Sequence, residues 1–146
     1  MPRHPNNPGW SRFDRLTFPP ATRHGNLLFI SGLTATDDQG NLVGEGDIAA
    51  QARRIYELMG RILAEAGATF DDVVKTTDYI TTAAQARDGT PSQDRSSYRD
   101  TAQVRRDIFG DDTAAGFPAA TGVIVSGLLR PGALIEIDAI AVLEGG

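Results

Sequence analysis

The clearest pattern of hydrophobic and polar positions lies in residues 47–66. Apolar residues recur there at spacings of three and four, as they do along one face of an amphipathic helix. Asp47 precedes the first of them and is a good N-cap, because its side chain can accept a hydrogen bond from a free amide of the first turn. Gly67 follows the last and tolerates a positive φ. The pattern predicts a helix over residues 47–66.

Segments with the pattern of β-strands lie on both sides of this helix. Residues 27–34 are mostly apolar and end in a turn at residues 37–41, where aspartate, glycine and asparagine gather. A short return strand at residues 42–43 would complete a hairpin. Residues 73–82 are rich in β-branched residues and tyrosine, and they predict a further strand.

The remainder of the chain predicts a helix and two more strands. A polar loop is expected over residues 83–93, followed by a helix with a thin apolar face over about 94–109. Two closing strands are expected at 121–128 and 134–143, joined by a turn at residues 130–132. The predicted order is ββαβαββ, an α+β arrangement without an internal repeat.

This order predicts one domain and an oligomer. We expect the domain to span residues 17–146, after a segment at residues 1–16 that is irregular or holds a short edge element. The closing strands carry apolar residues on both faces, yet two helices cover only one face of a small sheet. The other face is therefore expected to pack against further copies of the chain, with clefts between the subunits.

Composition and charge narrow the classes of function. The 146 residues are 40% hydrophobic and 23% charged, which fits one globular domain, and no apolar run approaches the ~18 residues of a membrane helix. Cysteine is absent, which excludes disulfides, thiol catalysis, zinc fingers and iron–sulfur sites. The formal net charge of -5 disfavours nucleic acid as a partner. Because no signal peptide is visible, we expect a cytoplasmic protein that does not bind membranes.

Two candidate motifs have simple structural explanations. Residues 44–49 match G-x-G-x-x-A, but no strand leads directly into the glycines, and Glu65 lies inside the predicted helix rather than at the end of a second strand. We therefore interpret this segment as a turn followed by an N-cap. His24 is one of only two histidines and is more typical of a surface or turn position than of an acid–base catalyst.

Glu136 and Asp138 give a sharper signal. Both interrupt an apolar strand, and two residues apart they point to the same face. A carboxyl group on a covered face is costly unless it is paired, and desolvation raises its pKa toward the range used in general acid–base catalysis. A structural ion pair with an arginine, or a solvated strand end, is the alternative for both residues.

The sequence resembles the RidA/YjgF (Rid) family over about residues 17–143. Five blocks carry the resemblance: 25–32 (GNLLFISG), 66–68 (AGA), 72–77 (DVVKTT), 117–119 (FPA) and 135–141 (IEIDAIA). The resemblance implies a chorismate-mutase-like α+β fold with two helices on one face, and a homotrimer whose sheets form a central barrel. It also implies hydrolysis of 2-aminoacrylate-like enamines or their imine tautomers in clefts between subunits, with no metal or organic cofactor.

Some site residues of the family carry over to this chain. Ser31 and Gly32 match the Ser-Gly segment of the first strand, and Glu136 matches the glutamate that positions water. The substrate-binding arginine of the deaminases does not carry over, because Ala120 stands at its position, just before Thr121. Losing two parallel guanidinium–carboxylate bonds costs on the order of 10²-fold in recognising a small acid.

Two further departures make the expected pocket less polar. Phe18 stands where relatives place an aromatic hydroxyl, and Leu33 stands where glutamine often follows the Ser-Gly pair. The candidates to replace the missing guanidinium are Arg23, Arg105, Arg106 and Arg130.

From these residues we expect a Rid-type hydrolase of an imine, an enamine or a related small substrate. Glu136 would deliver a proton or orient water, Thr121 and amides near Gly32 would hold a polar atom, and Phe18 and Leu33 would form apolar walls. A substrate larger or less charged than a small amino-acid imine fits best. A cofactor-free tautomerase or ring-opening enzyme that uses Glu136 and a non-catalytic trimer that binds a metabolite or a protein stay open as alternatives. The loop at 83–95 has a length and composition that permit a lid.

Overall fold

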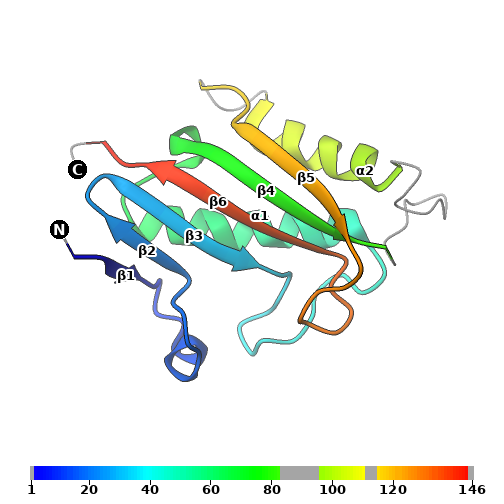
Figure 1. The fold of residues 1–146 in the computed structure, drawn as a ribbon, viewed down its shortest axis with the longest axis horizontal. Helices are drawn as coiled ribbons and strands as arrows, with labels where there is room; N and C mark the ends of the chain where they lie inside the picture. Colours follow the sequence, from blue (N-terminus) through cyan, green and yellow to red (C-terminus); the bar gives the residue numbers. More distant parts are fainter. Residues whose placement is uncertain (1, 83–95, 111–114, 145–146) are drawn as a thin grey trace.

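The computed structural model describes residues 2–82, 96–110 and 115–144, which form a six-stranded mixed sheet with two helices on one face (Figure 1). The strands lie in the order β1-β2-β3-β6-β4-β5. Their bounds are β1 His4–Asn6, β2 Ala21–His24, β3 Leu27–Leu33, β4 Val73–Thr81, β5 Ala119–Val125 and β6 Ile135–Val142. The helical elements are α1 Ile48–Glu65, α2 Ser96–Arg105, the 3-10 turns η1 Ser11–Arg15 and η2 Phe70–Asp72, and the π-helical turn η4 Arg106–Gly110. The α+β class expected from the sequence is confirmed.

Helix α1 forms where the sequence predicts it, because both of its ends are specified locally. The Asp47 side chain accepts a hydrogen bond from the Ala50 amide at 3.0 Å, as expected for an N-cap. Gly67 takes a φ of 76° just after the helix. Between these ends, the apolar stripe of α1 packs on the sheet and supplies much of the core.

Strand β3 has a different hairpin partner from the one that the sequence predicts. It pairs with β2 on one side and with β6 on the other, both antiparallel. The two residues between β2 and β3 turn the chain tightly, with Gly25 at a φ of 59°. The expected return strand at residues 42–43 is reduced to an isolated bridge between Thr36 and Leu42.

The two C-terminal strands are not neighbours in the sheet, because β4 lies between them. Strand β5 runs parallel to β4, and α2 lies in the crossover between the two. The strand also spans Ala119–Val125 rather than the expected 121–128. Three expectations concern residues outside the described ranges. They are the loop at 83–93, the lid at 83–95 and the start of a helix at 94.

The N-terminal segment is more ordered than the sequence suggests. Strand β1 pairs with β2 as the edge of the sheet, which matches the short edge element allowed there. The turn η1 follows, and its Phe13 side chain is buried. Asn6 donates from its side chain to the Ile62 carbonyl at 3.1 Å and so ties this segment to α1.

The two faces of the sheet differ in how they are covered. In β6, Ile135, Ile137, Ala139 and Ala141 are buried on the helix side, while the residues between them are only half-buried. On the side away from the helices, Phe29 of β3 retains 43% of its surface exposed in the single chain. The structure therefore presents apolar side chains on a face that no helix of its own covers. No helix within the described ranges is long and apolar enough to cross a membrane.

Candidate active site

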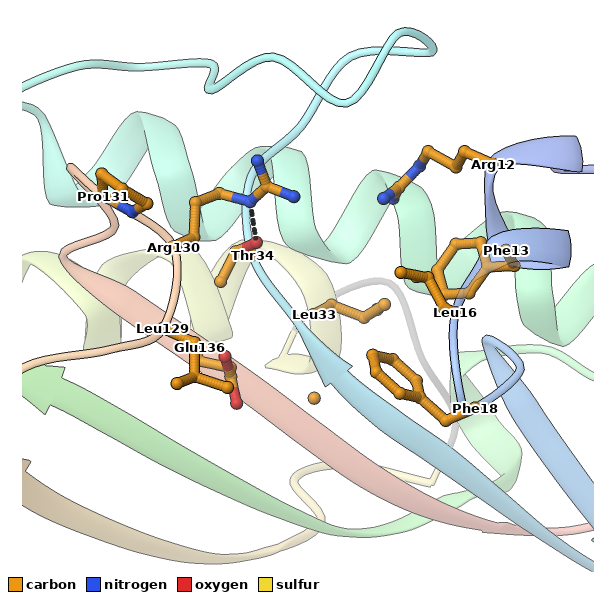
Figure 2. A pocket seen from close by; sticks show the side chains of 11 residues that line it. Arg12, Phe13, Leu16, Phe18, Leu33, Thr34, Leu129, Arg130, Pro131 and Glu136 are labelled. Atoms are coloured by element: carbon orange, nitrogen blue, oxygen red, sulfur yellow. Dashed lines mark hydrogen bonds between the residues drawn. The ribbon is translucent and has the colours of Figure 1, made fainter.

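A pocket of about 350 Å³ opens between the end of β3, η1 and the loop before β6 (Figure 2). It contains five of the residues singled out from the sequence, namely Phe18, Gly32, Leu33, Arg130 and Glu136. The other lining residues are Arg12, Phe13, Leu16, Thr34, Leu129 and Pro131. The pocket therefore combines apolar walls with one carboxyl group and two guanidinium groups.

The alternation of β6 brings Glu136 to this pocket. Its neighbours Ile135 and Ile137 point into the core, so Glu136 points to the opposite face. There it lies against Gly32, at which an added Cβ would meet Glu136 Oε2 at 2.5 Å. Partial burial raises the pKa of Glu136, and the nearby charge of Asp138 raises it further. The carboxyl group is thus suited to hold and release a proton nearer neutral pH than an ordinary glutamate.

Two guanidinium groups also line the pocket. Arg12, in η1, donates to Thr36 Oγ1 at 3.2 Å. Arg130, in the loop before β6, donates to Thr34 Oγ1 at 3.0 Å and to the Gly40 carbonyl at 2.7 Å. In Figure 2 the two groups point toward each other. All of these acceptors are neutral, so the contacts fix the side chains without neutralising them.

Ser31 supports the pocket from outside its lining. Its hydroxyl donates to the Pro19 carbonyl at 2.7 Å, and its amide donates to the Pro20 carbonyl at 2.9 Å. These two bonds fasten the segment that carries Phe18 to β3. In the single chain, Ser31 therefore positions a wall of the pocket.

Ala120 and Thr121 do not reach this pocket within one chain. They are consecutive in β5, so their side chains point to opposite faces, and β4 separates them from β6. Ala120 lines a second cavity of about 320 Å³ on the helix side, whereas Thr121 Oγ1 accepts a hydrogen bond from Lys75 Nζ at 3.0 Å. Their expected role concerns a cleft between subunits and stays a prediction.

The four arginines named as replacements for the missing guanidinium occupy three places. Arg130 lines the Glu136 pocket. Arg105 and Arg106 line the cavity beside Ala120, where Arg105 donates to Thr76 Oγ1 at 2.6 Å. Arg23 donates to the Gly25 carbonyl in the β2–β3 turn.

A second titratable cluster lies beneath α2, on the helix side of β4. Asp78 is only 9% exposed, and its Oδ1 atom has no hydrogen-bond partner within the described part of the chain. Burial raises the pKa of Asp78 to about 6, against the opposing charge of Arg105. Burial likewise raises the pKa of the neighbouring Tyr56 hydroxyl, which Arg105 contacts at 3.5 Å. We therefore expect this carboxyl group to make the stability of the fold depend on pH.

Asp78→Asn is expected to stabilise the protein above pH 6. The folded carboxyl keeps its proton up to about pH 6, whereas an unfolded aspartate loses it near pH 3.9. The folded state thus binds more protons in this range, so the free energy of unfolding falls as pH rises from about 4 to 7. The total fall in the free energy of unfolding over this pH range is on the order of 3 kcal/mol. Thermal unfolding of the wild type and of Asp78→Asn between pH 4 and pH 8 measures this pH dependence.

The variant should lose most of this pH dependence and melt several degrees higher at pH 8, since ~1 kcal/mol moves the midpoint by about 2–4 °C in a domain of this size. Asp14→Asn is the matched control, because Asp14 is exposed and its replacement should leave the slope unchanged. A lower melting temperature for Asp78→Asn at pH 8 contradicts this reading of the buried carboxyl.

Among the residues that the structure describes, no three histidine or acidic side chains gather as a metal-binding group. The polar groups that line the pocket are the Glu136 carboxyl, the guanidinium groups of Arg12 and Arg130, and the Thr34 hydroxyl.

The family model described as Endoribonuclease L-PSP matches residues 14–143. This range covers most of the chain. The chain belongs to the Rid family.

Relatives of this Rid protein match it over most of their own length. A RutC family protein of Pyrococcus abyssi is 33% identical over 124 residues, which are 85% of this chain and 84% of the relative. The 3-aminoacrylate deaminase RutC of Acinetobacter baylyi is 30% identical over 122 residues, which are 84% and 83% of the two chains.

Solved structures agree with this assignment. A member of the YjgF/YER057c/UK114 family from Mycobacterium tuberculosis is 30% identical and has a TM-score of 0.72, with 97% of this chain and 100% of that chain covered. A Rid family protein of unknown function from Yersinia pestis is also 30% identical, with a TM-score of 0.75 and the same coverage. In this Rid protein, Glu136 and Gly32 lie within the range of the family match, whereas Arg12 precedes it.

Sequence reasoning missed Arg12 because it lies in a segment rich in proline and asparagine. One signal was present: Trp10, Phe13 and Leu16 are spaced by three, which suits a short 3-10 turn that docks one side on the domain. The structure has this turn, and the rings of Trp10 and Phe13 lie 6.0 Å apart.

Proposed function

We propose that this Rid protein hydrolyses the C=N bond of an imine, or of the imine tautomer of an enamine, with Glu136 as the acid–base group. The observation that carries the proposal is the partly buried Glu136 carboxyl, whose pKa is raised, packed against Gly32 in a pocket. A relative at 30% identity is a 3-aminoacrylate deaminase, and its reaction is of the same class.

One carboxyl group is sufficient for this chemistry. In its neutral form, Glu136 donates a proton to the imine nitrogen while water adds to the carbon, and the resulting carboxylate takes a proton from the added water. The neutral acid then protonates the amine of the carbinolamine. The C–N bond breaks, ammonia leaves, and the carboxylate recovers its proton as the carbonyl forms. The cycle consumes one water and needs no electron acceptor.

The walls of the pocket favour a substrate larger than a three-carbon imine. A volume of about 350 Å³ falls in the range of about 300–1,000 Å³ that is typical of sites for larger organic ligands. Phe18 and Leu33 form apolar walls on the side of η1 and β3 (Figure 2). With Ala120 in place of the deaminase arginine, the site offers no guanidinium from β5 to a small acid.

We further propose that three copies associate through the face of the sheet opposite the helices, and that Ala120 and Thr121 of one copy approach the Glu136 pocket of another. Exposed apolar side chains on that face, such as Phe29, support this arrangement. Light scattering on the purified protein should give three times the chain mass, and Phe29→Asp should lower it. A stable wild-type monomer contradicts the proposal.

The function is tested by supplying imines to the purified protein. An amino-acid oxidase generates them in situ, and semicarbazide competes with hydrolysis for each imine, so semicarbazone absorbance falls when hydrolysis is accelerated. Wild-type protein should suppress the semicarbazone from amino acids with long side chains, including those such as glutamate whose side chain ends in a carboxylate, more than that from alanine or serine. No suppression with any imine contradicts the hydrolase, and rapid hydrolysis of only the smallest imines contradicts the proposed substrate size.

A further inference from the structure

The two arginines of the pocket come from segments that sequence reasoning does not connect. Arg12 lies in η1, before the range of the family match, and Arg130 lies between β5 and β6. Both line the pocket that holds Glu136, and their guanidinium groups point toward each other (Figure 2). A guanidinium has five N–H donors, and the described contacts use only some of them. Donors remain on both groups for a ligand.

Both guanidinium groups are held in place by neutral partners. Arg12 lies over the ring of Phe13, 4.5 Å from its centroid, and Phe13 is itself buried. Arg130 is fixed by the Thr34 hydroxyl and the Gly40 carbonyl. Because their positions are set before any ligand enters, little side-chain freedom is lost on binding.

The pocket carries two guanidinium groups that form no ion pair among the described residues. The ion pairs of the described chain involve Arg53, Arg54 and Arg61, and neither pocket arginine. Burial lowers the pKa of Arg12, and the charge of Arg130 lowers it further, against a weaker opposing effect of Asp37. Two like charges at close range in a partly dry site favour an anion between them.

Glu136 is not that anion. Its pKa is raised by burial and by Asp138, and neither arginine acts on it. In Figure 2 the Glu136 carboxyl group lies apart from both guanidinium groups, and the apolar side chains of Leu33 and Leu129 are among the residues that line the same pocket. This arrangement fits a molecule with an anionic end, an apolar body and a reacting end.

We propose that Arg12 and Arg130 together bind the carboxylate of the substrate, and that an apolar spacer separates this carboxylate from the carbon that reacts at Glu136. The substrate class is then an imine or enamine acid in which the carboxylate is remote from the C=N bond. Two guanidinium groups match the two oxygens of a carboxylate and form charge-assisted bonds. This inference rests on the proposed function, because it assigns the orientation of the substrate of that site.

The test measures binding without turnover. Calorimetry on the full chain gives the Kd of unreactive oxo acids whose ketone and carboxylate are separated by none to four methylene groups, each beside its methyl ester. Wild type should bind the longer acids best and each at least 10-fold more tightly than its ester. Arg12→Gln and Arg130→Gln should each weaken acid binding by about 10- to 100-fold and remove the preference over the ester. Arg53→Gln, which removes a charge that is paired with Asp107 outside the pocket, is the matched control and should change nothing.

Two variants separate binding from folding. Within the described residues the Arg12 side chain makes one hydrogen bond, to Thr36, so Arg12→Gln keeps the test valid if Arg130→Gln loosens its loop. Arg130→Lys keeps the charge but loses the paired geometry, and its acid affinity should lie between wild type and Arg130→Gln.

The outcomes are distinct. Equal affinity for acid and ester in the wild type, no saturable binding of any acid, or unchanged acid binding in both glutamine variants overturns the inference. Tighter, arginine-dependent binding of an alkyl phosphate of the same length overturns the assignment to a carboxylate. Imine hydrolysis by a wild type that fails these binding tests leaves the proposed function standing without the inference. Acid binding that depends on both arginines, in a protein that hydrolyses no imine, supports the inference for the pocket and rejects the reaction.

Discussion

Glu136→Gln is expected to lower kcat for imine hydrolysis by about 10²- to 10⁴-fold. Glutamine has nearly the same size and fits beside Gly32, but it can neither give a proton to the nitrogen nor take one from water. Since the amide keeps the shape of the pocket, affinity for an unreactive oxo acid should stay close to that of the wild type. The semicarbazide competition assay gives kcat, and calorimetry gives the affinity.

Asp138→Asn is the matched control for this experiment. Asp138 lies on the same face of β6, two residues away, and accepts a hydrogen bond from the Tyr79 hydroxyl at 3.1 Å. Its charge is the second cause of the raised pKa of Glu136, so the variant should lower that pKa while keeping the catalyst. Because the neutral acid is the active form, the fall in rate with rising pH should move to lower pH without loss of the maximum rate.

Two results would contradict the role of Glu136. A Glu136→Gln protein with the kcat of the wild type excludes this carboxyl as the proton donor. A wild type without turnover, whose ligand affinity is the same in Glu136→Gln, identifies a binding protein on a Rid scaffold. A wild type that isomerises or opens its substrate without releasing ammonia, and loses this activity in Glu136→Gln, identifies the tautomerase or ring-opening alternative.

Gln51→Leu is expected to lower the free energy of unfolding by about 2–6 kcal/mol. The side chain of Gln51 is fully buried and makes three hydrogen bonds, donating to the carbonyls of Gly44 and Gly132 and accepting from the Leu134 amide. Leucine fills a similar volume but leaves the Gly44 carbonyl and the Leu134 amide, both at half-buried residues, without these partners, at about 1–3 kcal/mol each. Gly132 is exposed, so its carbonyl can bond to water instead. Because the free energy of unfolding of a typical protein is about 5–15 kcal/mol, this loss is a large share of the total stability. Urea denaturation measures it.

Gln103→Leu provides the comparison for this loss. Gln103 is exposed, and its side chain donates to the exposed Asp107 at 3.0 Å, so its replacement should change stability by no more than about 0.5 kcal/mol. Gln51 also bonds to Gly132 and Leu134, at the end of the turn that follows Arg130. The loop that carries this arginine should therefore lose order in the Gln51 variant, and oxo-acid affinity should fall with it. A loss of less than 1 kcal/mol in Gln51→Leu excludes the three bonds as a major constraint.

Local signals were enough to predict α1 but not the pairing of the strands. Asp47, the apolar stripe and Gly67 act within a few residues of each other, so the helix can be read from its own sequence. The β2–β3 hairpin also had a local signal, since Gly25 and Asn26 lie between its strands. It was missed because β2 has only four residues and three of them, Thr22, Arg23 and His24, are polar.

The position of β5 could not be predicted from its own residues. Its sequence is apolar enough for any strand, and its neighbour in the sheet is decided by the crossover through α2, which places it beside β4. For the same reason the sequence did not show that Ala120 and Thr121 lie two strands from Glu136 in the same chain. The sequence predicted only the alternation within β6, which places Glu136 and Asp138 on one face.

Only some of the residues that line the pocket could be predicted from the sequence. Phe18, Gly32, Leu33 and Glu136 could be named because the family resemblance covers them, and the structure places them around one cavity. Arg12 could not, since its approach depends on η1 docking through Phe13 onto the rest of the domain. The cations of the pocket are thus set by the tertiary fold rather than by a motif.

The contacts of Lys75 give the protein a built-in chemical reporter. Lys75 is the only lysine in the sequence, and its ammonium group donates to the Thr76 carbonyl and to the hydroxyls of Thr77 and Thr121, bridging β4 and β5. Acylating reagents therefore have a single side-chain amine to modify, and it stands on the face of the sheet away from the helices. The rate at which Lys75 is acylated, followed by the mass of the intact chain, reports whether that face is exposed to solvent or covered by another copy. No engineered label is needed.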